Sequence, residues 1–158
     1  MQDPLLDEIE AVYRQQYSSF LRVAAAITGD EESGRDAVQD GFAGAVRSHH
    51  RNRRSGTLEA WLWRAVVNAA RTRRRATLVC EPLADDALAS ENGTRSDIRA
   101  LLAALPERQR LIVFLRYFAD LDYRTIARVA GVRTGTVSAT LSAAHDALRT
   151  RLKEELHA

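Results

Sequence analysis

The chain of 158 residues is 46% hydrophobic, so it is long enough to form one domain or two small ones with buried cores. Its single cysteine, Cys80, excludes an internal disulfide, and no apolar run approaches the ~20 residues that a membrane-spanning helix needs. The acidic start, MQDPLLDEIE, lacks the pattern of a signal peptide. We therefore expect a cytoplasmic protein without membrane insertion.

The formal net charge is only +2, but the charges are arranged in four alternating blocks. Residues 1–46 contain three arginines and nine acidic residues, and residues 47–75 contain nine arginines and one glutamate. Residues 76–98 contain one arginine and five acidic residues, and residues 99–158 contain ten basic and six acidic residues. Basic blocks suit phosphate, whereas acidic blocks suit basic protein surfaces or repel DNA.

The N-terminal half predicts helices, because apolar residues recur at spacings of three and four and no strand-like alternation persists. We expect helices over about 7–27 and 31–47, with a stop at Thr28-Gly29 and a cap at Asp30. The expected inward residues are Ile9, Val12, Tyr13, Phe20, Leu21 and Ala24 in the first helix and Ala37, Val38, Phe42, Ala45 and Val46 in the second.

A third helix is expected over about 57–75, after a basic loop at 49–56. Its expected buried face comprises Leu58, Trp61, Leu62, Ala65, Val66 and Ala69. Arg64, Asn68, Arg71 and Arg75 follow at spacings of four, three and four and form a separate polar stripe.

Residues 76–96 contain Pro82 and Gly93 and show no clear period, so they are expected to be a linker. Helices over about 97–105 and 107–119 follow, with Pro106 between them. The sequence thus predicts an all-α fold in which two small helical domains, 1–75 and 97–158, are joined by a flexible linker.

The segment from Leu121 to Leu148 predicts a helix-turn-helix, with Gly131 in the turn and Val132 between the helices. Thr134 or Thr136 is expected to cap the second helix. The expected buried residues are Ile126, Ala127 and Ala130 in the first helix and Val137, Leu141, Ala144 and Leu148 in the second. The start of the second helix could enter a DNA major groove, although an ordinary helical hairpin also fits this spacing.

The order of three segments resembles the minimal two-domain, extracytoplasmic-function (ECF, group 4) sigma factors of bacterial RNA polymerase, within the sigma-70 family. The segments are RDAVQDGF (35–42), LEAWLWRAVVNAARTRRR (58–75) and LLAALPERQRLIVFLRYFADLDYRTIARVAGVRTGTV (101–137), and the resemblance extends over about 13–152. It implies a transcription initiation factor that binds core polymerase and directs it to specific promoters. The helix-turn-helix alone would also fit a different DNA-binding regulator.

The resemblance implies a site for the clamp coiled coil of the largest polymerase subunit at Asp36, Gln39, Asp40 and Phe42. Asp36 and Asp40 are one helical turn apart, which suits an arginine on a partner helix. From the residues alone, a solvated acidic face is the simpler interpretation, and Phe42 fits the core slightly better than an interface. Gly41 replaces a β-branched residue of the family and is expected to weaken the helix by ~1 kcal/mol relative to alanine.

The third helix matches the part of the family that reads and melts the −10 element. The implied DNA-binding residues are Trp63, Arg64, Asn68, Arg71, Arg73, Arg74 and Arg75. Arginine binds phosphate, asparagine bonds to a base edge, and an aromatic ring stacks on an unpaired base. Trp61 is assigned to the core and Trp63 to DNA, with the loop 49–56 over the extruded base. The arginines also fit a solvated helix end.

The C-terminal domain matches the part that reads the −35 element. The implied residues are Arg116, Arg133, Thr134, Thr136, Ser138, Ala139 and Thr140, and His145 is expected to face outward. Relatives commonly have basic residues at the positions of Ser138, Thr140 and Ala143, and this chain has none there. Fewer phosphate contacts predict weaker or different −35 recognition with a flatter salt dependence.

The expected partners are core RNA polymerase, through the clamp coiled coil and the flap of the second-largest subunit, promoter DNA, and an anti-sigma factor. No cofactor, catalytic residue or metal site is expected, because the chain lacks a recognisable phosphate loop or nucleophile motif. His49 and His50 would point in different directions on a helix and form a poor metal pair. Two alternatives remain open: a helix-turn-helix regulator that binds duplex DNA without polymerase, and a sigma-derived protein-interaction module.

Overall fold

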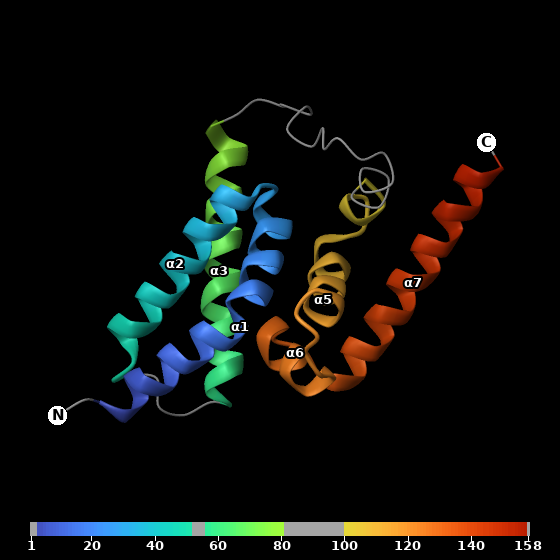
Figure 1. Ribbon diagram of the computed structural model, residues 1–158. Coiled ribbons are helices and arrows are strands. Elements are labelled where there is room, and N and C mark those ends of the chain that lie inside the picture. Colours follow the sequence, from blue (N-terminus) through green and yellow to red (C-terminus); the bar gives the residue numbers. More distant parts are fainter. Residues whose placement is uncertain (1–2, 52–55, 81–99, 158) are drawn as a thin grey trace. The chain divides into compact units, whose positions relative to one another are not determined.

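The computed structural model describes residues 3–51, 56–80 and 100–157, and within these residues all regular elements are helical (Figure 1). The helices belong to two compact units, one containing α1, α2 and α3 and the other α5, α6 and α7. This confirms the predicted all-α class with two helical units. Among the described residues, none of the helices combines the length and apolar character needed to cross a membrane.

The bounds of the first three helices follow the predicted ones closely. These helices are α1 (Pro4–Thr28), α2 (Glu31–Ser48) and α3 (Leu58–Cys80), and each packs against the other two. Helix α3 runs five residues past the predicted end at Arg75, into the predicted linker. The rest of that linker (81–96), the first three residues of the helix expected at 97–105, and part of the basic loop (52–55) lie outside the described residues.

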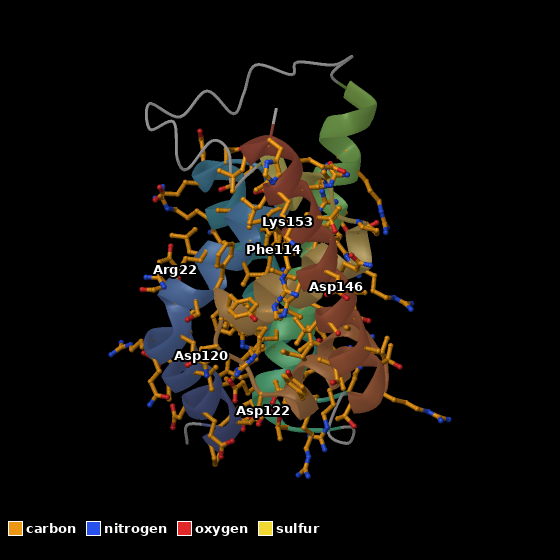
Figure 2. All side chains as sticks on the ribbon, turned by 90° about the vertical axis from the view of Figure 1, so that its right-hand side faces the viewer. Arg22, Phe114, Asp120, Asp122, Asp146 and Lys153 are labelled. Atoms are coloured by element: carbon orange, nitrogen blue, oxygen red, sulfur yellow. The ribbon has the colours of Figure 1, made fainter. Side chains whose placement is uncertain are left out.

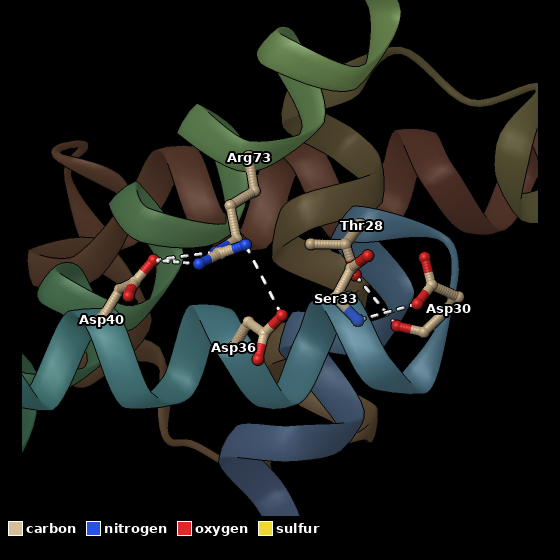
Figure 3. Close-up of polar contacts among 6 residues, drawn as sticks. All are labelled: Thr28, Asp30, Ser33, Asp36, Asp40 and Arg73. Atoms are coloured by element: carbon tan, nitrogen blue, oxygen red, sulfur yellow. Dashed lines mark hydrogen bonds and ion pairs between the residues drawn. The ribbon is translucent and has the colours of Figure 1, made fainter. Parts of the chain in front are cut away.

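The junction between α1 and α2 is set by local capping chemistry. Helix α1 ends at Gly29, whose φ of +99° is a left-handed conformation that glycine adopts without a steric penalty. Asp30 then caps α2, and its Oδ1 accepts a hydrogen bond of 2.7 Å from the backbone N–H of Ser33 (Figure 3). The predicted stop and the predicted cap are both confirmed.

Two glycines allow α2 to approach its neighbours backbone to backbone. A Cβ atom on Gly34 would lie 2.6 Å from the backbone nitrogen of Ala25 in α1. A Cβ atom on Gly41 would lie 2.8 Å from the Cα atom of Val66 in α3. Gly41 is expected to weaken α2, but the packing requires a residue without a side chain at this position. Any side chain there would push α2 and α3 apart.

Aromatic rings fill the centre of this unit. Phe20 and Trp63 are fully buried, and their ring centroids lie 4.2 Å apart. Phe42 packs edge-on against Phe20 at 5.1 Å and against Tyr13 at 4.8 Å. Trp63 also donates a hydrogen bond of 3.1 Å from Nε1 to Oε1 of Gln16, so its polar atom is satisfied inside the unit.

The buried face of α3 differs from the predicted one. The buried residues are Ala60, Leu62, Trp63, Val66, Val67 and Ala70, whereas Leu58, Trp61, Ala65 and Ala69 are only half-buried. One residue corresponds to a rotation of roughly 100° about a helix axis. Because this stretch is apolar at most positions, the spacing of its apolar residues predicted a helix but could not predict which side of that helix faces the core. The inward placement of Tyr13 and Val46 was also wrong, since they are 36% and 42% exposed.

The second unit contains α5 (Glu107–Tyr117), α6 (Tyr123–Ala130) and α7 (Thr134–Leu156). Helix α5 buries the five residues from Leu111 to Leu115. Residues 100–103, in the described part of the expected helix at 97–105, are helical, and Leu101 is buried. The three numbered helices pack against one another, so this unit has its own core.

The α6–α7 turn has the geometry that Gly131 predicted. Gly131 has a φ of +71°, and the N–H of Val132 donates a bond of 2.9 Å to the carbonyl of Ala127. The predicted cap of α7 was wrong: the N-cap residue is Arg133, and no side chain in the described part of the unit caps it. In α6, Val129 is buried and the predicted Ala130 is only half-buried. In α7, Val137, Leu141 and Ala144 are buried as predicted, and Leu148 is half-buried.

Candidate functional site

The acidic residues expected to bind polymerase form a patch on α2 together with an arginine from α3. Arg73 places Nη2 2.7 Å and Nε 2.8 Å from Oδ2 of Asp40, and Nη1 3.7 Å from Oδ2 of Asp36 (Figure 3). Gln39 is exposed beside them. The side chains of all three charged residues are between 38% and 52% exposed, so water screens these ion pairs.

Phe42, the fourth residue of the expected polymerase site, lies in the core of the unit. It is 7% exposed, with its ring edge-on to Phe20 and Tyr13. Of the two roles considered for Phe42, core residue and interface residue, its burial supports the first. Phe42 packs beneath α2 and presents almost no surface to a partner. The polar residues Asp36, Gln39 and Asp40 are the accessible part of the predicted site.

The expected −10 surface on α3 retains an exposed polar stripe but loses its aromatic member. Arg64, Asn68 and Arg75 are exposed, and Arg71 is half-buried. Trp63 was assigned to DNA, and its 0% exposure corrects that assignment because a fully buried indole cannot stack on an unpaired base. The error follows from the rotated face of α3, which buries Trp63 and leaves Trp61 half-buried.

Arg73 and Arg74, which were expected to hold the DNA backbone, have partners inside the unit. Arg73 bonds to the acidic residues of α2, as described above. Arg74 donates a hydrogen bond of 2.8 Å from Nη1 to the carbonyl of Ile27, in the last turn of α1. A cation at a helix C-terminus is favourable because the final carbonyls lack partners within the helix. Arg64 and Arg75 are the arginines of the stripe with the most open surroundings.

The expected −35 surface lies at the N-terminus of α7. Arg133, Thr134, Ser138 and Ala139 are exposed, and two further members, Thr136 and Thr140, are half-buried. The first N–H groups of a helix lack partners within the helix, and the helix dipole makes this end attractive to anions. Residues 134–148 contain neither lysine nor arginine. Phosphate contacts here would therefore come from Arg133 and the backbone.

Arg116, the remaining member of the expected −35 set, holds the turn between α5 and α6. Its Nη1 donates a bond of 3.1 Å to the carbonyl of Leu121, and its guanidinium carbon lies 5.7 Å from the ring centre of Tyr123. His145 is exposed, as expected, and its Nε2 lies 2.6 Å from the hydroxyl of Tyr117. These contacts connect α5 with both helices of the helix-turn-helix.

Asp122, labelled in Figure 2, fixes the start of α6. Its Oδ1 accepts a bond of 2.7 Å from the backbone N–H of Thr125. That bond stabilises the charged carboxylate and lowers the pKa of Asp122 below its usual value. The same cause, a bond from the N–H of Leu5, lowers the pKa of Asp3 at the start of α1. Both aspartates act as helix N-caps.

The structure brings together a third group of polar residues that the sequence analysis had set aside. His49 and His50 were expected to point apart, but α2 ends at Ser48, and the two rings lie with centroids 3.6 Å apart. Oδ2 of Asp3, 46 residues away in sequence, lies 3.1 Å from Nε2 of His49. Adjacent side chains point about 100° apart only while both residues are within a helix, and this pair follows the last residue of α2. The position of the pair directly after a predicted helix was the available signal.

Comparisons with known proteins cover both units. A family model described as Sigma-70 region 2 matches residues 12–77, and one described as Sigma-70, region 4 matches residues 95–148. The chain is 26% identical over 142 residues to the RNA polymerase sigma factor SigV of Bacillus subtilis (strain 168), with 86% of each chain covered. It is 28% identical over 160 residues to the ECF RNA polymerase sigma factor SigE of Mycolicibacterium smegmatis, covering 92% of this chain and 61% of that one.

The fold also resembles that of a solved structure. The sigma factor RpoE, solved with the anti-sigma factor NepR from Bartonella quintana, has a TM-score of 0.69 and 19% sequence identity to this chain. The similarity covers 92% of this chain and 97% of that one. At this identity the likeness concerns the fold alone.

Proposed function

Because the chain belongs to the sigma-70 family of RNA polymerase sigma factors, as one of the extracytoplasmic-function type, we propose that it binds core RNA polymerase and directs it to specific promoters. We assign residues 1–75 to core binding and −10 recognition, 76–96 to a linker, and 97–158 to −35 recognition. The observation that carries this proposal is the occurrence of both sigma-70 regions, in order, on two separate helical units.

The acidic patch of Asp36, Gln39 and Asp40 is the proposed contact for the clamp coiled coil of the largest subunit. A clamp arginine could bond to the carboxylates only in competition with Arg73, which already lies between them. The patch therefore has an internal cation that docking would displace or share. We assign the contact with the flap of the second-largest subunit to the C-terminal unit.

The exposed stripe of α3 is the proposed surface for the separated −10 strand. Arg64 and Asn68 are one helical turn apart and both exposed, so they can contact one strand together. Arginine would bind phosphate, and the amide of Asn68 would bond to a base edge. Arg71 and Arg75 extend the same stripe along α3 and would hold the adjoining backbone.

The N-terminus of α7 is the proposed −35 reader. Backbone N–H groups at Thr134 and Gly135, with the Arg133 side chain, would bind phosphate. Exposed Ala139 would contact a thymine methyl group, and Ser138 would bond to a base or phosphate. With no basic residue at 138, 140 or 143, this unit would contribute less affinity than a more basic one. Promoter choice would then depend more strongly on the −10 contacts.

An anti-sigma factor is the proposed regulatory partner. The structural relative RpoE was solved with such a protein, NepR. The acidic patch on α2 and the start of α7 are the surfaces that polymerase and DNA would use, so a protein that covers either one would block initiation. Co-purification of the chain with its partner tests this assignment. The co-purified chain should not bind polymerase, and it should bind polymerase once the partner is removed.

Transcription in vitro tests the proposed function. The chain is added to core polymerase over genomic promoter fragments, and transcripts are mapped at their 5′ ends. New start sites that share upstream elements would support the proposal. The double substitution Arg64→Ala and Asn68→Ala should abolish initiation while core binding persists. Arg22→Ala, which removes an exposed arginine on α1, serves as the matched control.

Two outcomes would favour the alternatives. If the chain binds duplex DNA by itself, and if it neither binds core polymerase nor starts transcripts, it is a helix-turn-helix regulator. If it binds core polymerase and starts no transcripts at any promoter, it is a sigma-derived interaction module. The missing basic residues at 138, 140 and 143 are the observation that favours this second candidate.

A further inference from the structure

We propose that Asp3, His49 and His50 form a binding site for a divalent transition-metal ion of the zinc type. One ligand atom from each residue lies within 4.8 Å of the others. Asp3 is the N-cap of α1, and His49 is the C-cap of α2. The site is thus built from two helix ends that are far apart in sequence, and its two histidines begin the basic loop 49–56.

The orientation of His49 is the first argument for a cation. Nδ1 of its buried ring bonds to the carbonyl oxygen of Val46, which only an N–H group can do. In the neutral ring, Nε2 is then an acceptor, and it faces a second acceptor, Oδ2 of Asp3, at 3.1 Å. Two lone pairs facing each other need a proton or a metal ion between them. The bond to Val46 is also the outer contact that typically fixes a histidine ligand on a metal.

The spacing of these two atoms fits a metal ion. Zinc binds histidine nitrogen and carboxylate oxygen at distances near 2.0–2.2 Å, which in a tetrahedral site places the two ligand atoms roughly 3.3–3.5 Å apart. The observed separation of 3.1 Å is shorter than this range by a few tenths of an ångström, so the two atoms would move slightly apart as an ion enters. The other oxygen of Asp3, Oδ1, accepts a bond of 3.0 Å from the N–H of Leu5, which holds the carboxylate in place.

His50 supplies the third ligand. Its ring lies with its centroid 3.6 Å from that of His49, and its side chain is exposed and can turn toward the ion. Water would occupy the fourth position. Two imidazoles and one carboxylate favour zinc, cobalt or nickel over magnesium and calcium, which prefer oxygen ligands alone. A bound ion would connect the start of α1 to the end of α2.

Calorimetric titration of the full chain, without a polyhistidine tag, with Zn²⁺ tests the site, and Co²⁺ absorption reports the coordination geometry. We expect one ion per chain and the intense visible bands of tetrahedral cobalt. His50→Ala should weaken Zn²⁺ binding at least tenfold, and Asp3→Asn should do the same while it preserves the N-cap. His157→Ala removes an exposed histidine at the other end of the chain and should leave the affinity unchanged.

Thermal unfolding supplies an independent measurement. Zn²⁺ should raise the unfolding temperature of the parent chain and of His157→Ala, and not that of His50→Ala or Asp3→Asn. The proposal is overturned if Zn²⁺ gives no binding heat, because a protonated His49 paired with Asp3 then accounts for the contact. It is also overturned if His50→Ala and Asp3→Asn bind Zn²⁺ as tightly as the parent.

Discussion

Arg73 and Asp40 join the two surfaces that the sequence assigns to different partners. Nη2 of Arg73, in the helix assigned to DNA, lies 2.7 Å from Oδ2 of Asp40, in the patch assigned to polymerase. The two residues are 33 positions apart in sequence, and the pair connects α3 to α2. An event that displaces Arg73 from the carboxylates would therefore change both surfaces at once.

Replacement of Arg73 by alanine should affect binding more than stability. Because the ion pairs are partly exposed, we expect the free energy of unfolding to fall by less than ~1 kcal/mol. Affinity for core polymerase should increase, because Asp36 and Asp40 lose their internal competitor. Fluorescence anisotropy with labelled chain and core polymerase measures this. Asp40→Asn should instead weaken core binding, and weaker binding by Arg73→Ala would show that the arginine itself contacts polymerase.

Gly41→Ala should destabilise the first unit, although alanine is the better helix former by ~1 kcal/mol. The new Cβ would meet the backbone of Val66 at 2.8 Å, and such overpacking typically costs about 1–3 kcal/mol. Gly44→Ala is the matched control on the same helix. Its nearest atom would be the end of the Arg47 side chain at 3.9 Å, so it should stabilise the chain. Urea unfolding of both variants measures the difference, and equal stabilisation would contradict the close packing of α2 on α3.

The two tryptophans should differ in fluorescence. Trp63 is fully buried and bonded to Gln16, whereas Trp61 is half-buried. The variant Trp61→Phe, which retains Trp63, should emit at shorter wavelength and resist quenching by iodide. Trp63→Phe should show the opposite behaviour. Equal quenching of both variants would restore Trp63 as a candidate for contact with DNA.

Asp122 predicts acid sensitivity of the second unit. Because the folded pKa lies below the unfolded one, the stabilising contribution is complete above the unfolded pKa of about 3.9 and is lost as the pH falls through the folded value. Asp122→Ala should cost about 0.5–2 kcal/mol near neutral pH, and the difference from the parent should shrink in acid. Asp122→Asn keeps a capping oxygen without a titrating group, so its loss should be smaller. Denaturant unfolding at several pH values measures this, and a cost for Asp122→Ala that is independent of pH would exclude the carboxylate as the cause.

Features set by neighbouring residues were predictable from the sequence. Thr28-Gly29 and Asp30 marked a helix end and a helix start, and Gly131 marked the turn of the helix-turn-helix, because each acts through its own backbone or a nearby N–H. The helices themselves followed from apolar spacing. These features depend on no contact that is distant in sequence.

Features that depend on packing between helices were not predictable. The stretch from Leu58 to Ala70 is apolar at most positions, so only the positions of α1 and α2 decide that Trp63, and not Trp61, faces the core. The pairing of Arg73 with Asp40 and the approach of Asp3 to His49 likewise join residues that are 33 and 46 positions apart. A single sequence contains no signal for such pairs beyond their chemical complementarity.

A basic residue at position 138 should strengthen binding of duplex −35 DNA by the C-terminal unit. Ser138 is exposed near the start of α7, and residues 134–148 contain neither lysine nor arginine. If Ser138→Arg adds one phosphate contact, the slope of log affinity against log salt concentration should steepen by about 0.9. Thr150→Arg adds the same charge at an exposed position sixteen residues after Thr134 on α7 and should leave the slope nearly unchanged. Holoenzyme binding to promoter fragments over a range of salt concentrations measures both slopes. Equal steepening by the two variants would mean that net charge, rather than contact at the start of α7, governs the affinity for DNA.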